Sequence, residues 1–197
     1  MQTLKQFLRR LARWLGLISE PESAELVDLA RKIERQASLE TLALTDAQLE
    51  VLKETIGHAR RSRDVATIAF FTGASGTRKT AAAEVLSNEL QRDLYRVDLS
   101  RVVSNYIGET EKNLRQLLGA AERADAILFF DESDPLFGKR SEVKDAHDRY
   151  ANIEVSYLLQ RLESYRGLAL LATNEEKPND ELLRRIRIVI DFPFPSS

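Results

Sequence analysis

Five short apolar runs, separated by helical patterns, constrain the fold of this chain most strongly. They are the segments 67–72, 94–99, 126–131, 168–173 and 186–191. Helices are expected between them at 79–90, 110–122, 149–165 and 179–184. The first run, TIAFFT, is apolar at nearly every position, which is typical of a strand buried on both faces. Because strands that alternate with helices form parallel sheets, residues 63–197 are predicted to be an α/β domain with a five-stranded parallel sheet covered on both faces.

Residues 1–62 have a different pattern and are predicted to form an N-terminal helical region. Within it, residues 2–18 are predicted to form a basic amphipathic helix in which one face is apolar and the other carries Lys5, Arg9, Arg10 and Arg13. Such a helix suits contact with an anionic membrane surface or docking on a partner. It equally suits packing against its own protein, so the three alternatives stay open.

Two further helices are expected before the sheet. One begins near Pro21, and its apolar side is formed by Leu26, Leu29, Ala30 and Ile33. The other begins after a capping box made by Thr45 and Gln48. A charged linker is expected at 59–64.

The composition argues against several classes of function. The 197 residues contain no cysteine, which excludes disulfides and thiolate metal sites and suits a reducing compartment such as the cytoplasm. Two histidines make a histidine-built metal centre improbable. A net charge of −2 gives no reason to expect a nucleic-acid partner. No apolar run approaches the ~20 residues that cross a bilayer.

The segment GASGTRKT, between the first strand and the helix that follows it, nearly matches the phosphate-binding pattern G-x-x-x-x-G-K-[ST]. Its residues are Gly73, Ala74, Ser75, Gly76, Thr77, Arg78, Lys79 and Thr80, and Arg78 stands where the second glycine is expected. Backbone N–H groups of such a loop attract a polyphosphate, Lys79 reaches the phosphates, and Thr80 binds Mg²⁺. Taken by itself, this segment is compatible with a working nucleotide site, a damaged nucleotide site or an ordinary glycine turn.

A pair of acids supports the first of these readings. Asp131 and Glu132 follow the buried run AILFF, at the carboxyl end of a predicted parallel strand. Ligands of open α/β sheets bind at this edge. Asp131 is therefore expected to hold Mg²⁺, and Glu132 to orient and deprotonate an attacking water. The structural alternative is that acids often end strands.

Together these motifs resemble the large ATPase subdomain of the AAA-type ATPases, over residues 65–197. FTGASGTRKT resembles the Walker A loop and ILFFDES the Walker B strand. LLATN resembles the sensor 1 strand, which implies that Asn174 contacts the catalytic water or the γ-phosphate. Residues 138–155 are similar to the segment that follows Walker B in bacterial members of the family.

The resemblance also implies an assembly and a protein substrate. ELLRRIRIVIDFPFP is similar to the family segment that carries arginine fingers, which implies catalytic roles for Arg184 and Arg185 across a subunit boundary. In SNYIGETEKNL, residues Tyr106, Ile107 and Gly108 match the pore loop that grips a polypeptide. The expected partners are copies of this chain in a hexameric ring, or a full-length AAA protein, together with a protein substrate.

Two departures from the family pattern qualify this expectation. A side chain at Arg78 obstructs the approach of the backbone to phosphate, so weakened nucleotide binding is expected. Family members also continue into a helical lid after the last strand, which this sequence does not include. The leading hypothesis is an ATPase that uses ATP and Mg²⁺ to remodel a protein. The rival is a weakened nucleotide-binding or assembly subunit.

Overall fold

A computed structural model describes most of the sheet and the helices that cover it. It describes residues 29–34, 36–40, 42, 44–61, 66–76, 78–104, 106, 108–131, 133, 157–174, 186 and 188–193. No helix within these ranges is long and apolar enough to cross a bilayer.

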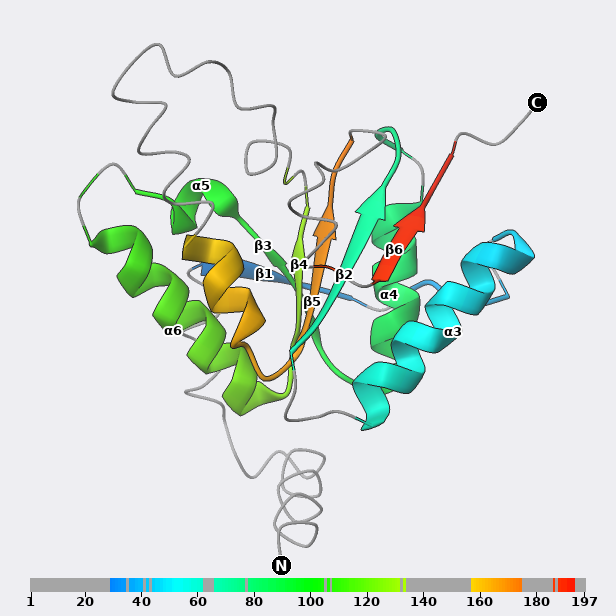
Figure 1. The fold of residues 1–197 in the computed structure, drawn as a ribbon, viewed down its shortest axis with the longest axis horizontal. Helices are drawn as coiled ribbons and strands as arrows, with labels where there is room; N and C mark the ends of the chain where they lie inside the picture. Colours follow the sequence, from blue (N-terminus) through cyan, green and yellow to red (C-terminus); the bar gives the residue numbers. More distant parts are fainter. Residues whose placement is uncertain are drawn as a thin grey trace, which may run out of the picture.

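The described strands form one six-stranded sheet in the order β1-β3-β4-β5-β2-β6 (Figure 1). Their bounds are Ala30–Ile33 for β1, Thr67–Thr72 for β2, Leu94–Val97 for β3, Ile127–Phe130 for β4, Leu168–Ala172 for β5 and Ile188–Asp191 for β6. The strands β3, β4, β5, β2 and β6 run parallel to one another. The predicted α/β fold with five parallel strands is therefore confirmed.

The sixth strand corrects the prediction for Ala30–Ile33, which were expected to be helical. They form β1, which pairs antiparallel with β3 so that Ala30 lies opposite Val97 and Ile33 opposite Leu94. The apolar spacing fitted a helix, but β3 would otherwise expose a row of unpaired backbone groups at the edge of the sheet. Pairing with β1 satisfies those groups, and a long-range contact of this kind has no local sequence signal.

Helices cover both faces of the sheet (Figure 1). They are α3 Asp46–Arg61, α4 Lys79–Leu90, the short α5 Leu99–Val102, and α6 Glu109–Ala124, and residues 157–163 are helical as well. Successive strand residues point to opposite faces. Phe71 and Phe129 accordingly pack in the core beneath α3 and α4, whereas Phe70 and Phe130 pack in the core beneath α6. This alternation explains why β4 and β5 are apolar at every position.

The predicted start of α3 is confirmed in detail. The Thr45 N–H donates to Gln48 Oε1 at 2.9 Å, and the Gln48 N–H donates to Thr45 Oγ1 at 3.3 Å. The Gln48 side chain also donates to the carbonyl of Asp191 at 2.6 Å, which joins the helix to β6. The helix continues to Arg61, three residues into the expected linker, because Ala59 is buried against the sheet.

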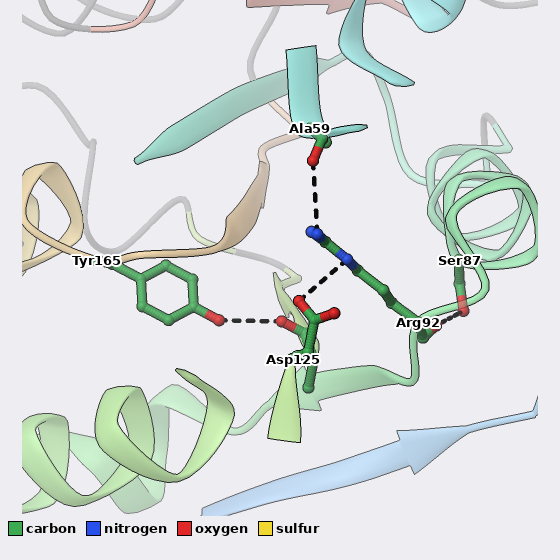
Figure 2. A network of polar contacts seen from close by, with 6 residues as sticks. Ala59, Ser87, Arg92, Asp125 and Tyr165 are labelled. Carbon is green, nitrogen blue, oxygen red and sulfur yellow. Dashed lines mark hydrogen bonds and ion pairs between the residues drawn. The ribbon is translucent and has the colours of Figure 1, made fainter. Parts of the chain in front are cut away.

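A buried arginine organises the end of the sheet at which the parallel strands begin (Figure 2). Arg92 precedes β3, and its side chain donates to the carbonyl of Ala59 at 3.5 Å and pairs with Asp125 Oδ1 at 3.1 Å. The Ser87 hydroxyl donates to the Arg92 carbonyl at 2.5 Å. One residue thus joins the ends of α3, α4 and α6 at this edge.

Tyr165 lies in the same region, ahead of β5. Its hydroxyl donates to the carbonyl of Ala126 at 3.0 Å (Figure 2). Burial, and then the negative charge of Glu122, raise the pKa of the Tyr165 hydroxyl above its usual range. A Cβ at Gly167 would lie 2.5 Å from the tyrosine ring, so only glycine lets the chain turn here into β5.

Candidate functional site

The loop between β2 and α4 has an unusual backbone. Gly73 has a φ of 122°, Gly76 a φ of 81° and Arg78 a φ of 63°. At Gly73 a Cβ would lie 2.1 Å from the carbonyl oxygen of Phe192, so no side chain fits there. The tight loop therefore ends directly at the first turn of α4, where backbone N–H groups without helical partners favour an anion.

Arg78 occupies a position that favours glycine. It precedes α4 in the left-handed conformation, it makes no side-chain cap, and it is exposed. This conformation costs a residue with a Cβ about 1–2 kcal/mol. The structure therefore places strain at the residue where the sequence departs from the phosphate-loop pattern.

Lys79 folds back onto the loop that precedes it. Its side chain is buried, and its Nζ donates to the carbonyls of Gly73 and Ala74, the latter at 2.8 Å. The same Nζ donates to Asn174 Oδ1 at 3.3 Å. The amine is thus held at the centre of the loop, and it links the loop to the end of β5.

Asp131 directly follows β4 and is paired with a residue that the sequence analysis did not single out. Its Oδ2 lies 2.9 Å from Nη2 of Arg96, on β3. Arg96 is the one charged residue in the strand LYRV. A charge in an otherwise uncharged strand was the one local signal, and the sequence does not show which strand lies beside the acids.

These elements surround one cavity of about 390 Å³. It is lined by Ser75, Gly76, Arg78, Lys79, Thr80, Ala81, Glu84, Asp131 and Asn174. Seven of these were predicted from the sequence as site residues, and they come from the ends of β4 and β5, from the loop after β2 and from the first turn of α4. Their roles remain predictions, but the convergence follows from the parallel sheet, whose strands all end at this edge.

Glu84 was also missed by the sequence analysis. Its Oε2 accepts the backbone N–H groups of Gln36 and Ala37, at 3.1 and 2.9 Å. The segment that follows β1 is thereby fixed to α4 beside the cavity. An acid within an alanine-rich helix carries no local signal of such a contact.

Tyr106 and Gly108, the two described residues of the predicted pore loop, do not line this cavity. Tyr106 is 74% exposed, and its N–H donates to the Ser104 hydroxyl at 3.3 Å. Gly108, with a φ of 83°, is the N-cap residue of α6. Tyr106 is the one exposed large hydrophobic side chain among the described residues.

Several predicted residues lie outside the described residues. They are Thr77, Ile107, Glu132, Arg184 and Arg185, together with the amphipathic segment 2–18.

The residues that line the cavity fit a nucleoside triphosphate with a divalent cation. An amine and the N-terminus of α4 provide positive charge for phosphates. The Thr80 hydroxyl and the Asp131 carboxylate are oxygen ligands of the kind that Mg²⁺ prefers. Asn174 contributes an amide beside the amine. The cavity volume lies in the range typical of small-molecule sites.

Comparisons with known proteins agree with this chemistry. The sequence model of the "ATPase family associated with various cellular activities (AAA)" matches residues 69–194. An uncharacterized AAA family ATPase of Sinorhizobium fredii is 31% identical over 191 residues, which cover 92% of this chain and 57% of that protein.

Two relatives with more specific names match shorter segments. A cell division cycle protein 48 homolog of Archaeoglobus fulgidus is 34% identical over 116 residues, or 57% of this chain and 16% of that protein. The 26S proteasome regulatory subunit 10B of Dictyostelium discoideum is 30% identical over 132 residues, or 63% of this chain and 34% of that protein. The chain therefore spans little more than half of its Sinorhizobium relative and less of the other two.

Proposed function

Because this chain belongs to the ATPase family associated with various cellular activities, we propose that it binds ATP and Mg²⁺ in the cavity at loop 73–80 and hydrolyses the ATP. One observation carries the proposal. Lys79, Asp131 and Asn174, from three separate segments, line a single cavity at the carboxyl edge of the sheet.

The proposed roles follow from the chemistry of each group. The backbone of the loop and the Lys79 amine bind the phosphates, and Thr80 and Asp131 hold Mg²⁺. Mg²⁺ held by these two residues would neutralise the charge that develops on the phosphate oxygens. Glu132 orients the attacking water and accepts its proton, while Asn174 holds that water or the terminal phosphate.

We further propose that hydrolysis drives remodelling of a bound protein within a ring. The exposed Tyr106 supports this, because it belongs to the predicted pore loop with Ile107 and Gly108. Arg184 and Arg185 are proposed to complete the site of a neighbouring subunit, in a hexamer of this chain or with a full-length AAA protein. One relative is by its name a subunit of a larger assembly, the 26S proteasome.

For residues 1–62, of which β1 and α3 pack as part of the sheet and its helical cover, the proposal is contact rather than catalysis. The basic face of segment 2–18 suits a partner, an anionic membrane surface or the rest of the protein.

A second candidate function is a nucleotide-binding or assembly subunit with weakened catalysis. The observation that favours it is the strained backbone of Arg78, which lines the cavity directly beside Lys79. A Cβ at this point of the loop hinders close approach of the backbone to phosphate.

Phosphate release at high protein concentration tests the two candidates. Wild-type protein is expected to release phosphate from Mg-ATP, and Glu132→Gln to bind nucleotide but release about 100-fold less. Glu111→Gln, which removes an exposed acid from α6, is the matched control and is expected to keep the wild-type rate. Nucleotide binding with near-zero release by both wild type and Glu132→Gln would favour the weakened subunit. Failure of the wild type to bind nucleotide would overturn both candidates.

A further inference from the structure

The ion pair between Arg96 and Asp131 has a geometric origin in the sheet. Arg96 lies opposite Phe129 in the pairing of β3 with β4. Asp131 follows Phe129 by two residues, so its side chain points to the same face of the sheet. The two charged groups therefore meet at the carboxyl edge, with Nη2 and Oδ2 2.9 Å apart.

We propose that Arg96 competes with Mg²⁺ for Asp131 and thereby sets how strongly nucleotide binding depends on the metal. The inference rests on the proposed function, in which Asp131 holds Mg²⁺. A guanidinium and a metal ion are both cations, and their repulsion disfavours simultaneous contact with one carboxylate. Binding of the metal therefore requires Arg96 to release Asp131.

The surroundings of Arg96 make this release feasible. The Arg96 side chain is 48% exposed, whereas that of Asp131 is 13% exposed. The arginine can therefore turn into solvent, while the carboxylate stays at the cavity that it lines. Arg96 thus acts as a positioning residue that occupies the metal-binding carboxylate before the metal arrives.

A neighbouring arginine supplies a control. Arg31 of β1 lies directly opposite Arg96 in the antiparallel ladder, so both side chains stand on one face. Arg31 carries the same charge as Arg96 but lies one strand further from Asp131.

The test measures the affinity of a fluorescent ATP analogue with excess EDTA and with saturating Mg²⁺, for wild type and Arg96→Gln. The ratio of the affinity with Mg²⁺ to the affinity in EDTA reports the coupling between metal and nucleotide. Removing Arg96 leaves Asp131 without this partner, which weakens binding in EDTA and strengthens it with Mg²⁺. The ratio is expected to rise about fivefold, because this is about the largest effect that a partly exposed ion pair has.

Arg31→Gln removes one arginine charge from the same face but leaves the ion pair of Arg96 with Asp131 in place. Its ratio is therefore expected to equal that of the wild type. Arg96→Lys keeps the charge and is expected to stay close to the wild type. An unchanged or lower ratio in Arg96→Gln, with nucleotide still bound, would overturn the inference alone. An equal rise in Arg31→Gln would also overturn it, because general electrostatics would then explain the effect. Absence of binding by the wild type in both conditions would overturn the proposed function and the inference together.

Discussion

The two ends of the parallel sheet are built from similar polar residues but serve different purposes. At the end where the strands begin, Arg92 and Tyr165 are buried and bonded to backbone carbonyls and to an acid (Figure 2). At the opposite end, Gly73 and Arg78 have positive φ values and Lys79 donates to carbonyls beside an open cavity. The first arrangement is complete without a ligand. The second has charge and space for one.

The comparison indicates that stability depends mainly on one end of the sheet and ligand binding on the other. Buried polar groups stabilise a structure only when they are fully hydrogen-bonded. Left-handed backbone occurs at both ends, at Arg78 and at the helix C-caps Gln91 and Asp125, so it is the cavity with its buried amine that distinguishes the carboxyl end. Substitutions at the beginning of the strands should therefore change stability, and substitutions at their carboxyl ends should change nucleotide binding. The predictions below test that separation.

The largest effect is expected for Lys79→Met, which keeps the length of the side chain and removes the amine. Affinity for Mg-ATP should fall about 100-fold, because a hydrogen-bonded charge contributes roughly 1.5–3 kcal/mol. Titration with a fluorescent ATP analogue measures it. Lys112→Met, at an exposed position of α6, should bind as the wild type does. Equal loss in both variants would remove any special role of Lys79.

At the other end, Arg92→Met should lower the free energy of unfolding by about 2 kcal/mol, because it removes a buried pair and a bond to a carbonyl. The expected loss of stability is moderate because the Asp125 side chain is half exposed. Urea denaturation measures the change. Arg101→Met removes an exposed arginine paired with Asp98 and should change stability by less than about 0.5 kcal/mol. A loss of nucleotide affinity in folded Arg92→Met would contradict the separation of the two ends.

Tyr165→Phe should cost about 1 kcal/mol of stability at neutral pH, since it removes the bond to Ala126. Because burial raises the pKa of Tyr165 in the folded state, the unfolded chain loses this proton first. Wild-type stability should therefore be retained up to about pH 10 and then fall by up to about 1.4 kcal/mol per pH unit. The gap between wild type and Tyr165→Phe should close above pH 10. Parallel pH profiles of the two proteins would contradict this.

The smallest effect is expected for Arg78→Gly, which should raise affinity for Mg-ATP about fivefold by removing the Cβ beside the phosphates, a gain of about 1 kcal/mol. Arg78→Ala keeps the Cβ and loses the guanidinium, so it should show no gain. Calorimetric titration compares the three proteins. Equal affinities of wild type and Arg78→Gly would refute the expectation that Arg78 weakens binding.

Much of the fold could be predicted because its signals are local. The continuous apolar runs identified the five parallel strands, and the capping box of Thr45 and Gln48 identified the start of α3. The convergence of Lys79, Asp131 and Asn174 followed from the rule that parallel strands end at one edge. Each of these inferences used a motif together with a strand or helix adjacent to it.

What could not be predicted depends on contacts between distant segments. The pairing of β1 with β3 overrode a helical spacing at Ala30–Ile33. The contact of Arg96 with Asp131 depends on the register of two strands, and the contact of Glu84 with Gln36 on where the segment after β1 crosses α4. Neither register nor crossing has a signature in a single sequence.

A titration with Mg-ATP, followed by the backbone amide resonances of the protein, tests the central claim most directly. The amides of Gly76, Arg78 and Lys79 should shift strongly, because phosphate oxygens accept their hydrogen bonds. Those of Arg92 and Tyr165, at the other end of the sheet, should stay unchanged. Unchanged amides throughout residues 73–80 at millimolar Mg-ATP would contradict the account, since no nucleotide would then occupy the cavity.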